Sequence, residues 1–223
     1  MPNLALIGYG KMGRMIDQLA IMYGFTVTAR LDVDRDEPLD GVDVAIEFST
    51  PAAVLGNVQK LAKRRIPIVV GTTGWLEHLN EARSIIAKND SALIWSPNFS
   101  VGVNVFQRVV AEASKLLKDE KEYGAWAWEI HHVTKKDAPS GTLLKLVQTM
   151  KESGYARDIS VSSNRAGAHP GTHEIGFDSP ADTITLRHTA RSREGFARGA
   201  LKAAQWIAGR KGFYEFGEAL FSV

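Results

Sequence analysis

The stretch NLALIGYGKMG at residues 3–13 decides the fold. Its first five residues predict a short buried strand, and a G-x-G-x-x-G turn follows at once and opens a helix. In this order Gly8 permits the tight turn, Gly10 lets the backbone approach a pyrophosphate, and Gly13 allows the helix to pack closely on the strand. The amino terminus of the helix offers free N–H groups and a positive dipole end to phosphate oxygens.

An acidic residue at the expected distance strengthens this interpretation. Asp32 follows the second predicted strand, FTVTARL at residues 25–31, and lies 19 residues beyond Gly13. An acid at about 20 residues accepts hydrogen bonds from the ribose of a dinucleotide. The alternative is a glycine-rich turn that binds nothing, with Asp32 as a solvated strand-end acid. The predicted cofactor-binding residues here are Gly8, Tyr9, Gly10, Lys11, Met12, Gly13 and Asp32.

Short strands alternate with helices over the first hundred residues, which predicts βαβ units and a parallel sheet. Further strands are predicted at 42–48, 67–70 and 92–95, and helices at 11–23, 51–63 and 76–88. Two loops follow strands at the sheet edge where open α/β sheets bind ligands. Ordinary β–α turns are the alternative interpretation. The candidate residues in these loops are Gly71, Thr72, Thr73, Ser96, Pro97, Asn98 and Phe99.

The pattern changes after about residue 100, where strands are no longer separated regularly by helices. A longer strand is predicted at 123–133, and the whole series indicates a second domain with a mixed or antiparallel sheet. The other predicted elements are helices at 103–117 and 139–152, strands at 159–163 and 182–189, and a final helix at 196–208.

The densest chemistry lies in EIHHVTKKDAPSGT at residues 129–142. Free N–H groups near Gly141 and Thr142, with the hydroxyls of Ser140 and Thr142, predict a site for a carboxylate or phosphate. A nearby ammonium group completes such a site as a point charge. A histidine adds a group that releases a proton near neutral pH, so the segment combines an anion site with a general acid. The alternative is a solvated basic loop before a capped helix.

Composition excludes several classes of protein. The chain has 223 residues, 44% of them apolar, no cysteine, and a net charge of +2. This composition builds a core, and it excludes disulfide frameworks, thiolate metal sites and a surface made mainly to bind nucleic acid. We expect no transmembrane helix and no secretory signal, and therefore a cytoplasmic protein. His169 and His173 have the spacing of a metal pair on a helix, but Pro170 and Gly171 lie between them, so we predict no metal site.

Taken together, these motifs resemble the dihydrodipicolinate reductases, also described as 4-hydroxy-tetrahydrodipicolinate reductases, of the diaminopimelate–lysine pathway. The match runs through nearly the whole chain in the order of the family. HHxxKxDAPSGT is highly specific and the other motifs support it. The residues that carry the resemblance are GYGKMG at 8–13, GTTG at 71–74, PNFSVGVN at 97–104, EIHHVTKKDAPSGT at 129–142 and HTARSREGFARGAL at 188–201.

The resemblance implies a role for each matching residue. His131 is the proton donor, and Lys135 is both a catalytic and a substrate-binding residue. His132 and the turn at Ser140, Gly141 and Thr142 hold a substrate carboxylate. The loops at 71–73 and 96–99 line the nicotinamide side.

The resemblance also implies a split Rossmann-type domain over residues 1–99 and 192–223. A substrate-binding and oligomerisation domain with an open mixed sheet occupies 100–191, and its sheets build a homotetramer. In this α/β fold the chain departs from the family pattern, because only about nine residues separate the strand ending near Asp32 from the strand starting at Val42. A Rossmann strand and helix are therefore expected to be missing, and the glycine loop is one residue shorter than in many relatives.

The implied reaction is an NAD(P)H-dependent reduction of a small cyclic dicarboxylate imine. Another dehydrogenase on the same scaffold, such as an amino-acid dehydrogenase, and a non-catalytic dinucleotide sensor are the alternatives. Asp32 favours the free 2′-hydroxyl of NADH, whereas Arg30 and Arg35 are candidate partners of the 2′-phosphate of NADPH. We expect use of both cofactors, with NADH at least as good.

Overall fold

The computed structural model describes residues 1–222, and the chain divides into two compact units. The first unit comprises residues 1–101 and 194–223, and the second comprises residues 102–193. The sequence-based prediction places these boundaries at residues 99 and 192. Each unit has its own hydrophobic core and its own sheet, so each is described by itself.

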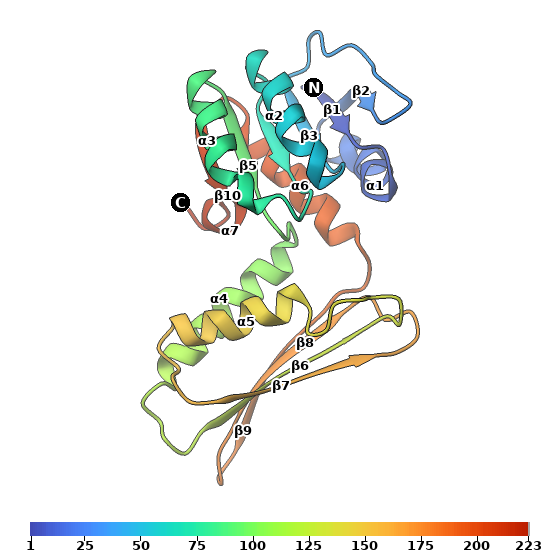
Figure 1. Ribbon diagram of the computed structural model, residues 1–223. Coiled ribbons are helices and arrows are strands. Elements are labelled where there is room, and N and C mark those ends of the chain that lie inside the picture. Colours follow the sequence, from blue (N-terminus) through green and yellow to red (C-terminus); the bar gives the residue numbers. More distant parts are fainter. Residues whose placement is uncertain (223) are drawn as a thin grey trace. The chain divides into compact units, whose positions relative to one another are not determined.

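The first unit is built on a six-stranded parallel sheet with the order β10-β5-β4-β3-β1-β2 (Figure 1). The central strands are buried on both faces, as their unbroken apolar runs predict. The strands are β1 (Asn3–Ile7), β2 (Thr26–Leu31), β3 (Val44–Glu47), β4 (Ile68–Val70), β5 (Ala92–Trp95) and β10 (Gly212–Glu215).

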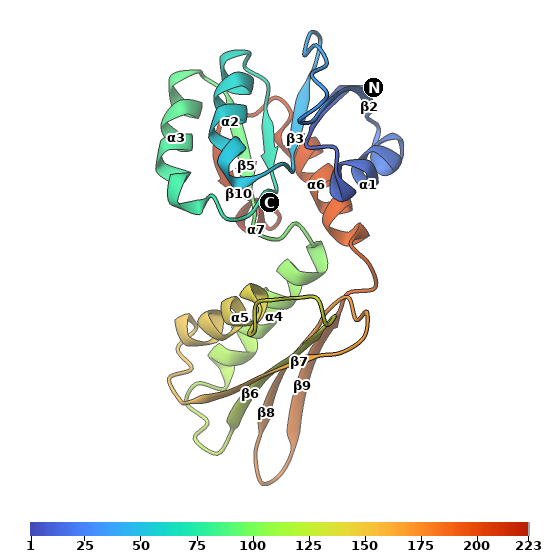
Figure 2. The same ribbon diagram turned by 45° about the vertical axis from the view of Figure 1, so that its right-hand side comes forward.

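Helices cover both faces of this sheet. Helices α1 (Lys11–Ala20) and α6 (Glu194–Ile207) pack on one face, and α2 (Val54–Lys63) and α3 (Leu79–Lys88) pack on the other (Figure 2). Short 3-10 turns precede α2 and α3 and follow α1. A short helix, α7 (Phe216–Ala219), follows β10. The predicted parallel sheet built from βαβ units is confirmed.

The expected omission in the Rossmann fold is also confirmed. No helix or strand lies between β2 and β3, and the connecting segment instead closes on itself through paired backbone hydrogen bonds between Asp32 and Arg35, of 2.7 and 3.1 Å. Strand β2 consequently forms an edge of the sheet. The residues at the end of β2 are therefore partly open to solvent rather than covered by a further strand.

The second unit is a four-stranded mixed sheet with the order β7-β6-β8-β9. Strand β6 pairs in parallel with β7 and antiparallel with β8, which pairs antiparallel with β9. Helices α4 (Val101–Leu116) and α5 (Gly141–Glu152) supply the apolar side chains that close the core over one face. The strands are β6 (Gly124–His131), β7 (Ile159–Arg165), β8 (Thr172–Asp178) and β9 (Thr183–Thr189).

Alternation along β6 separates its side chains onto two faces. Ala127, Glu129 and His131 are buried beneath the helices, whereas Trp126 and Trp128 are only half-buried on the opposite face. The ring of Trp126 lies directly on Gly176 of β8, where an added Cβ atom would be 2.0 Å from it. Among residues 1–222, no helix covers this outer face (Figure 2).

Three elements were not predicted from the sequence. Strand β8 carries Gly176 in its middle, and β10 and α7 extend the chain beyond the helix that was expected to be the last element. Helix α5 begins at Gly141 rather than at Pro139, because Ser140 caps it. None of the helices in the described part of the chain is long and apolar enough to cross a membrane.

Candidate active site

The glycine turn has the geometry that a phosphate-binding turn requires. Gly8 has a φ of +88°, and an added Cβ atom would lie 2.3 Å from the carbonyl oxygen of Phe48. At Gly13 an added Cβ atom would lie 2.3 Å from the oxygen of Gly8, so α1 packs directly on the turn. No atom approaches the open side of Gly10, and no side chain caps α1. The free N–H groups of this helix end fit a pyrophosphate.

Asp32 is held against the same turn. Its carboxylate accepts hydrogen bonds from the N–H of Tyr9 at 3.1 Å and from the N–H of Val33 at 2.9 Å. The carboxylate is therefore fixed beside the helix end, and it has acceptor capacity left for a ribose hydroxyl. Lys11 is exposed at the start of α1, and Met12 is half-buried in the core beneath it.

The loops that follow β3, β4 and β5 meet at the same edge of the sheet. The ring of Phe48 lies on Gly71, where an added Cβ atom would be 2.1 Å from the ring. The centres of the rings of Phe48 and Phe99 are 6.4 Å apart. Ser96 donates to the carbonyl of Asn98 at 2.9 Å and fixes the last loop. Thr72 is buried, whereas Thr73 and Pro97 are exposed.

A buried carboxyl group that the sequence analysis missed lies behind these loops. Glu47 ends β3, is fully buried, and contacts Ser49 and Asn57 through its Oε1 atom. Burial raises the pKa of Glu47. The signal in the sequence is the placement of an acid at the end of an otherwise apolar strand.

In the second unit the chemistry gathers at the end of β6. Alternation places Glu129 and His131 on the inner face, next to His173 of the neighbouring strand β8. The rings of His131 and His173 meet edge to face with centroids 5.0 Å apart. The sequence analysis missed Glu129 and discounted His173. Glu129 and His131 are two residues apart in a predicted strand, so their side chains lie on the same face, and this spacing predicts the inward position of Glu129.

Glu129 is the centre of a buried polar cluster. Its Oε1 atom accepts hydrogen bonds from the N–H of Ser140 at 2.9 Å and from Arg165 at 3.0 Å. Its Oε2 atom accepts from the hydroxyl of Ser140 and lies 3.5 Å from Nδ1 of His131 and 3.4 Å from Nε2 of His173. One carboxylate thus ties the start of α5 to the histidine pair.

This environment shifts the pKa values of the cluster. Burial alone would raise the pKa of Glu129, but hydrogen bonds from His173, Ser140 and Arg165 outweigh it and hold the carboxylate ionised. Burial lowers the pKa of His131 to about 4, and the nearby cations of Lys135 and Arg165 add to this effect. The charge of Glu129 opposes the shift. His131 is therefore neutral at neutral pH in the free protein.

A cationic side chain and a helix end form the predicted anion site. The hydroxyl of Ser140 accepts from the N–H of Leu143 at 3.2 Å and caps α5. Lys135 donates to both carboxylate oxygens of Asp137 at 2.8 and 2.9 Å. This lysine, together with the N–H of Gly141, lowers the pKa of Asp137. The carboxylate of Asp137 thus interacts with Lys135 and the start of α5, the groups that are predicted to bind a substrate carboxylate.

The remaining candidates lie at the margin of this cluster. His132 is half-buried, and its ring bonds the hydroxyl of Thr134 at 2.7 Å. Thr142 is half-buried in the first turn of α5.

The donor atoms of Glu129, His131 and His173 lie within 4.8 Å of one another, close enough to hold a metal ion. Both carboxylate oxygens already accept hydrogen bonds from Ser140 or Arg165, so we assign the cluster to hydrogen bonding. His169 lies outside the cluster and accepts from the N–H of Gly171.

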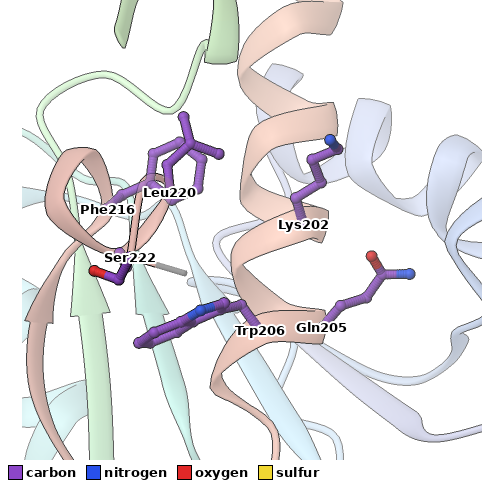
Figure 3. Close-up of a pocket in the computed structure, with 7 residues that line it drawn as sticks. Lys202, Gln205, Trp206, Phe216, Leu220 and Ser222 are labelled. Carbon is purple, nitrogen blue, oxygen red and sulfur yellow. The ribbon is translucent and has the colours of Figure 1, made fainter. Parts of the chain in front are cut away.

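A cavity of about 390 Å³ lies elsewhere, between α6 and the C-terminal segment (Figure 3). Its walls include Lys202, Trp206, Phe216 and Leu220. None of the predicted site residues lines this cavity.

These features define a class of protein. A shortened Rossmann unit with an open glycine turn, and a second unit with a buried His–Glu cluster beside a lysine and a helix end, are the parts of a dinucleotide-dependent oxidoreductase. The comparisons with known proteins agree. Residues 2–99 match the family described as dihydrodipicolinate reductase, N-terminus, and residues 102–220 match dihydrodipicolinate reductase, C-terminus. The chain belongs to the dihydrodipicolinate reductase family.

Curated relatives carry the same identification. A protein of Christiangramia forsetii named 4-hydroxy-tetrahydrodipicolinate reductase is 38% identical, with 98% of this chain and 97% of that protein covered. One of Methanoregula boonei with the same name is 34% identical, with 89% and 82% covered. A dipicolinate-bound dihydrodipicolinate reductase from Paenisporosarcina sp. TG-14 has the same fold, with a TM-score of 0.82, 22% identity, and 98% and 99% covered. The chain is an NAD(P)H-dependent reductase, as predicted.

Proposed function

We propose that this chain reduces 4-hydroxy-tetrahydrodipicolinate, or its dehydrated form dihydrodipicolinate, to tetrahydrodipicolinate on the path to diaminopimelate and lysine. The observation that carries the proposal is the Glu129–His131 cluster beside Lys135 and the capped start of α5. It joins a proton-transfer group to a site for a carboxylate, which a cyclic dicarboxylate needs and a protein that only senses dinucleotides does not.

His131 is proposed to give a proton to the substrate as negative charge develops on its ring. Glu129 lies 3.5 Å from Nδ1 of His131, which leaves the opposite nitrogen, Nε2, as the proton-donating atom. Because the pKa of His131 is about 4 in the free protein, the substrate must help to protonate it. Two bound carboxylates do this, since a nearby negative charge favours the charged imidazolium.

Lys135 and the start of α5 are proposed to bind the carboxylates. The ammonium of Lys135 already donates hydrogen bonds to both carboxylate oxygens of Asp137. The N–H groups of Gly141 and Thr142 lie in the first turn of α5 and point toward its amino terminus. Exchange of Asp137 for a substrate carboxylate keeps the charge of Lys135 balanced. His132 and Ser140 complete the proposed substrate site.

NAD(P)H bound at the glycine turn supplies the hydride. The turn and Asp32 hold its pyrophosphate and adenosine ribose, and the loops at 71–73 and 96–99 are proposed to line the nicotinamide. Phe48 fixes the loop after β4 through its contact with Gly71. Because this reaction draws on the NAD(P)H pool inside the cell, we place the enzyme in the cytoplasm. We propose a homotetramer built through the sheets of the second unit.

The test is turnover of the aldolase product of pyruvate and aspartate semialdehyde, followed by oxidation of NADH. His131→Ala should lower kcat by ~10²–10⁴ with little change in KM, because a general acid acts in the transition state. Lys135→Ala should raise KM and lower kcat together, because its charge binds the substrate and stabilises the reacting ring. Lys136→Ala, a change of the neighbouring exposed lysine, is the matched control.

The binding of NADH should be unchanged in all three variants when it is titrated separately. If His131→Ala keeps more than about a tenth of the parent kcat, the residue contributes less than ~1.4 kcal/mol to the barrier and is not the acid. Binding of NADH without turnover would indicate a sensor, and turnover of an amino acid instead would indicate a different dehydrogenase.

A further inference from the structure

An ion pair next to the glycine turn has no role in the reaction described above. The guanidinium of Arg30 on β2 binds Asp17 on α1 through two parallel hydrogen bonds, of 2.7 and 2.9 Å. The two side chains are only 26% and 18% exposed. Planar two-point pairing of this kind is among the strongest that an arginine makes. The pair is therefore a fixed feature and not a mobile surface contact.

The pair contacts Tyr9, a residue of the glycine turn. The hydroxyl of Tyr9 bonds Asp17, and the guanidinium of Arg30 lies 5.9 Å from the centre of the same ring. The backbone N–H of Tyr9 binds Asp32, the predicted ribose acceptor. Arg30 lies in β2 and precedes Asp32 by two residues, so Asp32 directly follows the strand that carries Arg30.

The other candidate for binding a 2′-phosphate is also paired. Arg35 donates through Nε to Glu37 at 2.6 Å, and the other oxygen of Glu37 accepts from the backbone N–H of Arg30 at 2.7 Å. Arg30 and Arg35 are thus each paired with an acid of this chain, whereas Arg14 donates to the backbone carbonyl of Tyr9. Asp17 has a pKa below its ordinary value: burial opposes this shift, but the hydrogen bonds from Arg30 and Tyr9 and the charges of Arg30 and Arg35 together outweigh it.

We propose that Asp17 sets the cofactor preference toward NADH by holding Arg30 away from a 2′-phosphate. The carboxylate of Asp32 would repel a 2′-phosphate. Arg30 would not be free to bind that phosphate, because it is already paired with Asp17. A free 2′-hydroxyl, by contrast, can donate a hydrogen bond to the carboxylate of Asp32. The inference deepens the cofactor part of the proposed function and rests on binding of the dinucleotide at this turn.

Cofactor titration in the absence of substrate tests it. The wild-type protein should bind NADH more tightly than NADPH. Asp17→Asn keeps the shape of the side chain but removes its charge, so it should tighten NADPH about tenfold. This is the effect of one charge-assisted contact worth ~1.4 kcal/mol. The affinity for NADH should change by less than about twofold.

Two further variants make the outcome specific. The double variant Asp17→Asn with Arg30→Gln should lose the gain in NADPH affinity, because the released guanidinium is then absent. Asp90→Asn makes the same change of net charge at an exposed pair with Lys211. These two residues precede β5 and β10, at the strand ends opposite to those that the glycine turn follows. It should leave both affinities unchanged. Thermal melting of each variant shows whether it is folded.

The results separate this inference from the proposed function. Tighter binding of NADPH than of NADH by the wild-type protein overturns the inference whatever the variants do. An unchanged ratio of affinities in folded Asp17→Asn also overturns it, while the proposed function stands. If neither cofactor binds the wild-type protein, the proposed function itself fails.

Discussion

At the scale of single residues, burial determines what the acidic side chains do. Glu129 and Glu47 are both fully buried, but their pKa values shift in opposite directions. Glu129 has an arginine and several donors around it, which stabilise its charge, whereas burial dominates at Glu47. A buried acid surrounded by donors is suited to orient a histidine, and we propose this part for Glu129 beside His131.

Replacement of Glu129 tests its effect on His131. Glu129→Gln should lower the free energy of unfolding by about 3 kcal/mol, because it leaves the half-buried Arg165 without a counter-charge. It should also lower the pKa of His131 further, because the charge of Glu129 raises that pKa. Urea unfolding measures the first effect, and a downward shift of the pH profile of kcat/KM measures the second.

Glu152→Gln is the control, because Glu152 is exposed near the end of α5 and should change neither quantity by much. A folded Glu129→Gln variant with an unshifted pH profile would limit Glu129 to a structural role.

The pH dependence of the reaction follows from the pKa of His131. A proton donor with a pKa of about 4 is protonated less by a factor of about ten for each pH unit above that value. Because kcat/KM reports groups of the free enzyme, it should fall as the pH rises from about 5 to 8. The profile of kcat should bend at a higher pH, because bound carboxylates raise the pKa of His131. A kcat/KM that rises with pH over this range would contradict the assignment.

Single residues also show how far the sequence can predict the site. His131, Lys135 and Ser140 stand in one specific motif, and the structure places all three at the end of β6 and the start of α5. Glu129 belongs to the same motif, but its importance depends on contacts with Arg165 and His173, which are 36 and 44 positions away. Such contacts follow from strand pairing, which no local pattern contains.

At the scale of elements, the missed strand β8 has a physical explanation. Its sequence, THEIGFD, contains a glycine and four polar residues, and glycine disfavours a strand interior. The glycine is required because the ring of Trp126 occupies the space of a side chain at Gly176. Strand β10 was missed because it has four residues and pairs with β5, which lies more than a hundred residues earlier. Strands with strong apolar runs, such as β1 and β5, were predicted with their observed bounds.

Helix α6 contains a matched pair of glycines that tests its packing on the cofactor loop. At Gly199 an added Cβ atom would lie 1.6 Å from the oxygen of Phe99, whereas at Gly195 the nearest atom would be 3.5 Å away. Gly199→Ala should therefore cost ~2–3 kcal/mol of stability and weaken NADH binding by displacing the 96–99 loop. Gly195→Ala should be neutral or stabilising by up to ~1 kcal/mol.

Urea unfolding and NADH titration of both variants measure these effects. Equal behaviour of the two variants would show that α6 does not determine the position of the loop.

At the scale of the whole molecule, the outer face of the second sheet is the surface through which we expect the chain to associate. Trp126, Trp128 and Ile130 share this face and are only half-buried, and the side chains around them are mostly polar and small. Trp128 donates to Asn164 of β7 at 3.1 Å, which ties the ring to the neighbouring strand. Two large rings on an uncovered sheet face are typical of a surface that buries itself against another protein.

We therefore expect light scattering at micromolar concentration to give a mass about four times the 24.4 kDa of the chain. Trp128→Glu should lower that mass, because a charge buried between two sheets has no partner to balance it. Leu76→Glu changes an exposed apolar side chain of the first unit and should leave the mass unchanged. Circular dichroism of each variant confirms that the sheets are intact. A wild-type monomer, or a Trp128→Glu variant that keeps the full mass, would show that the tryptophan face is not the surface that joins the subunits.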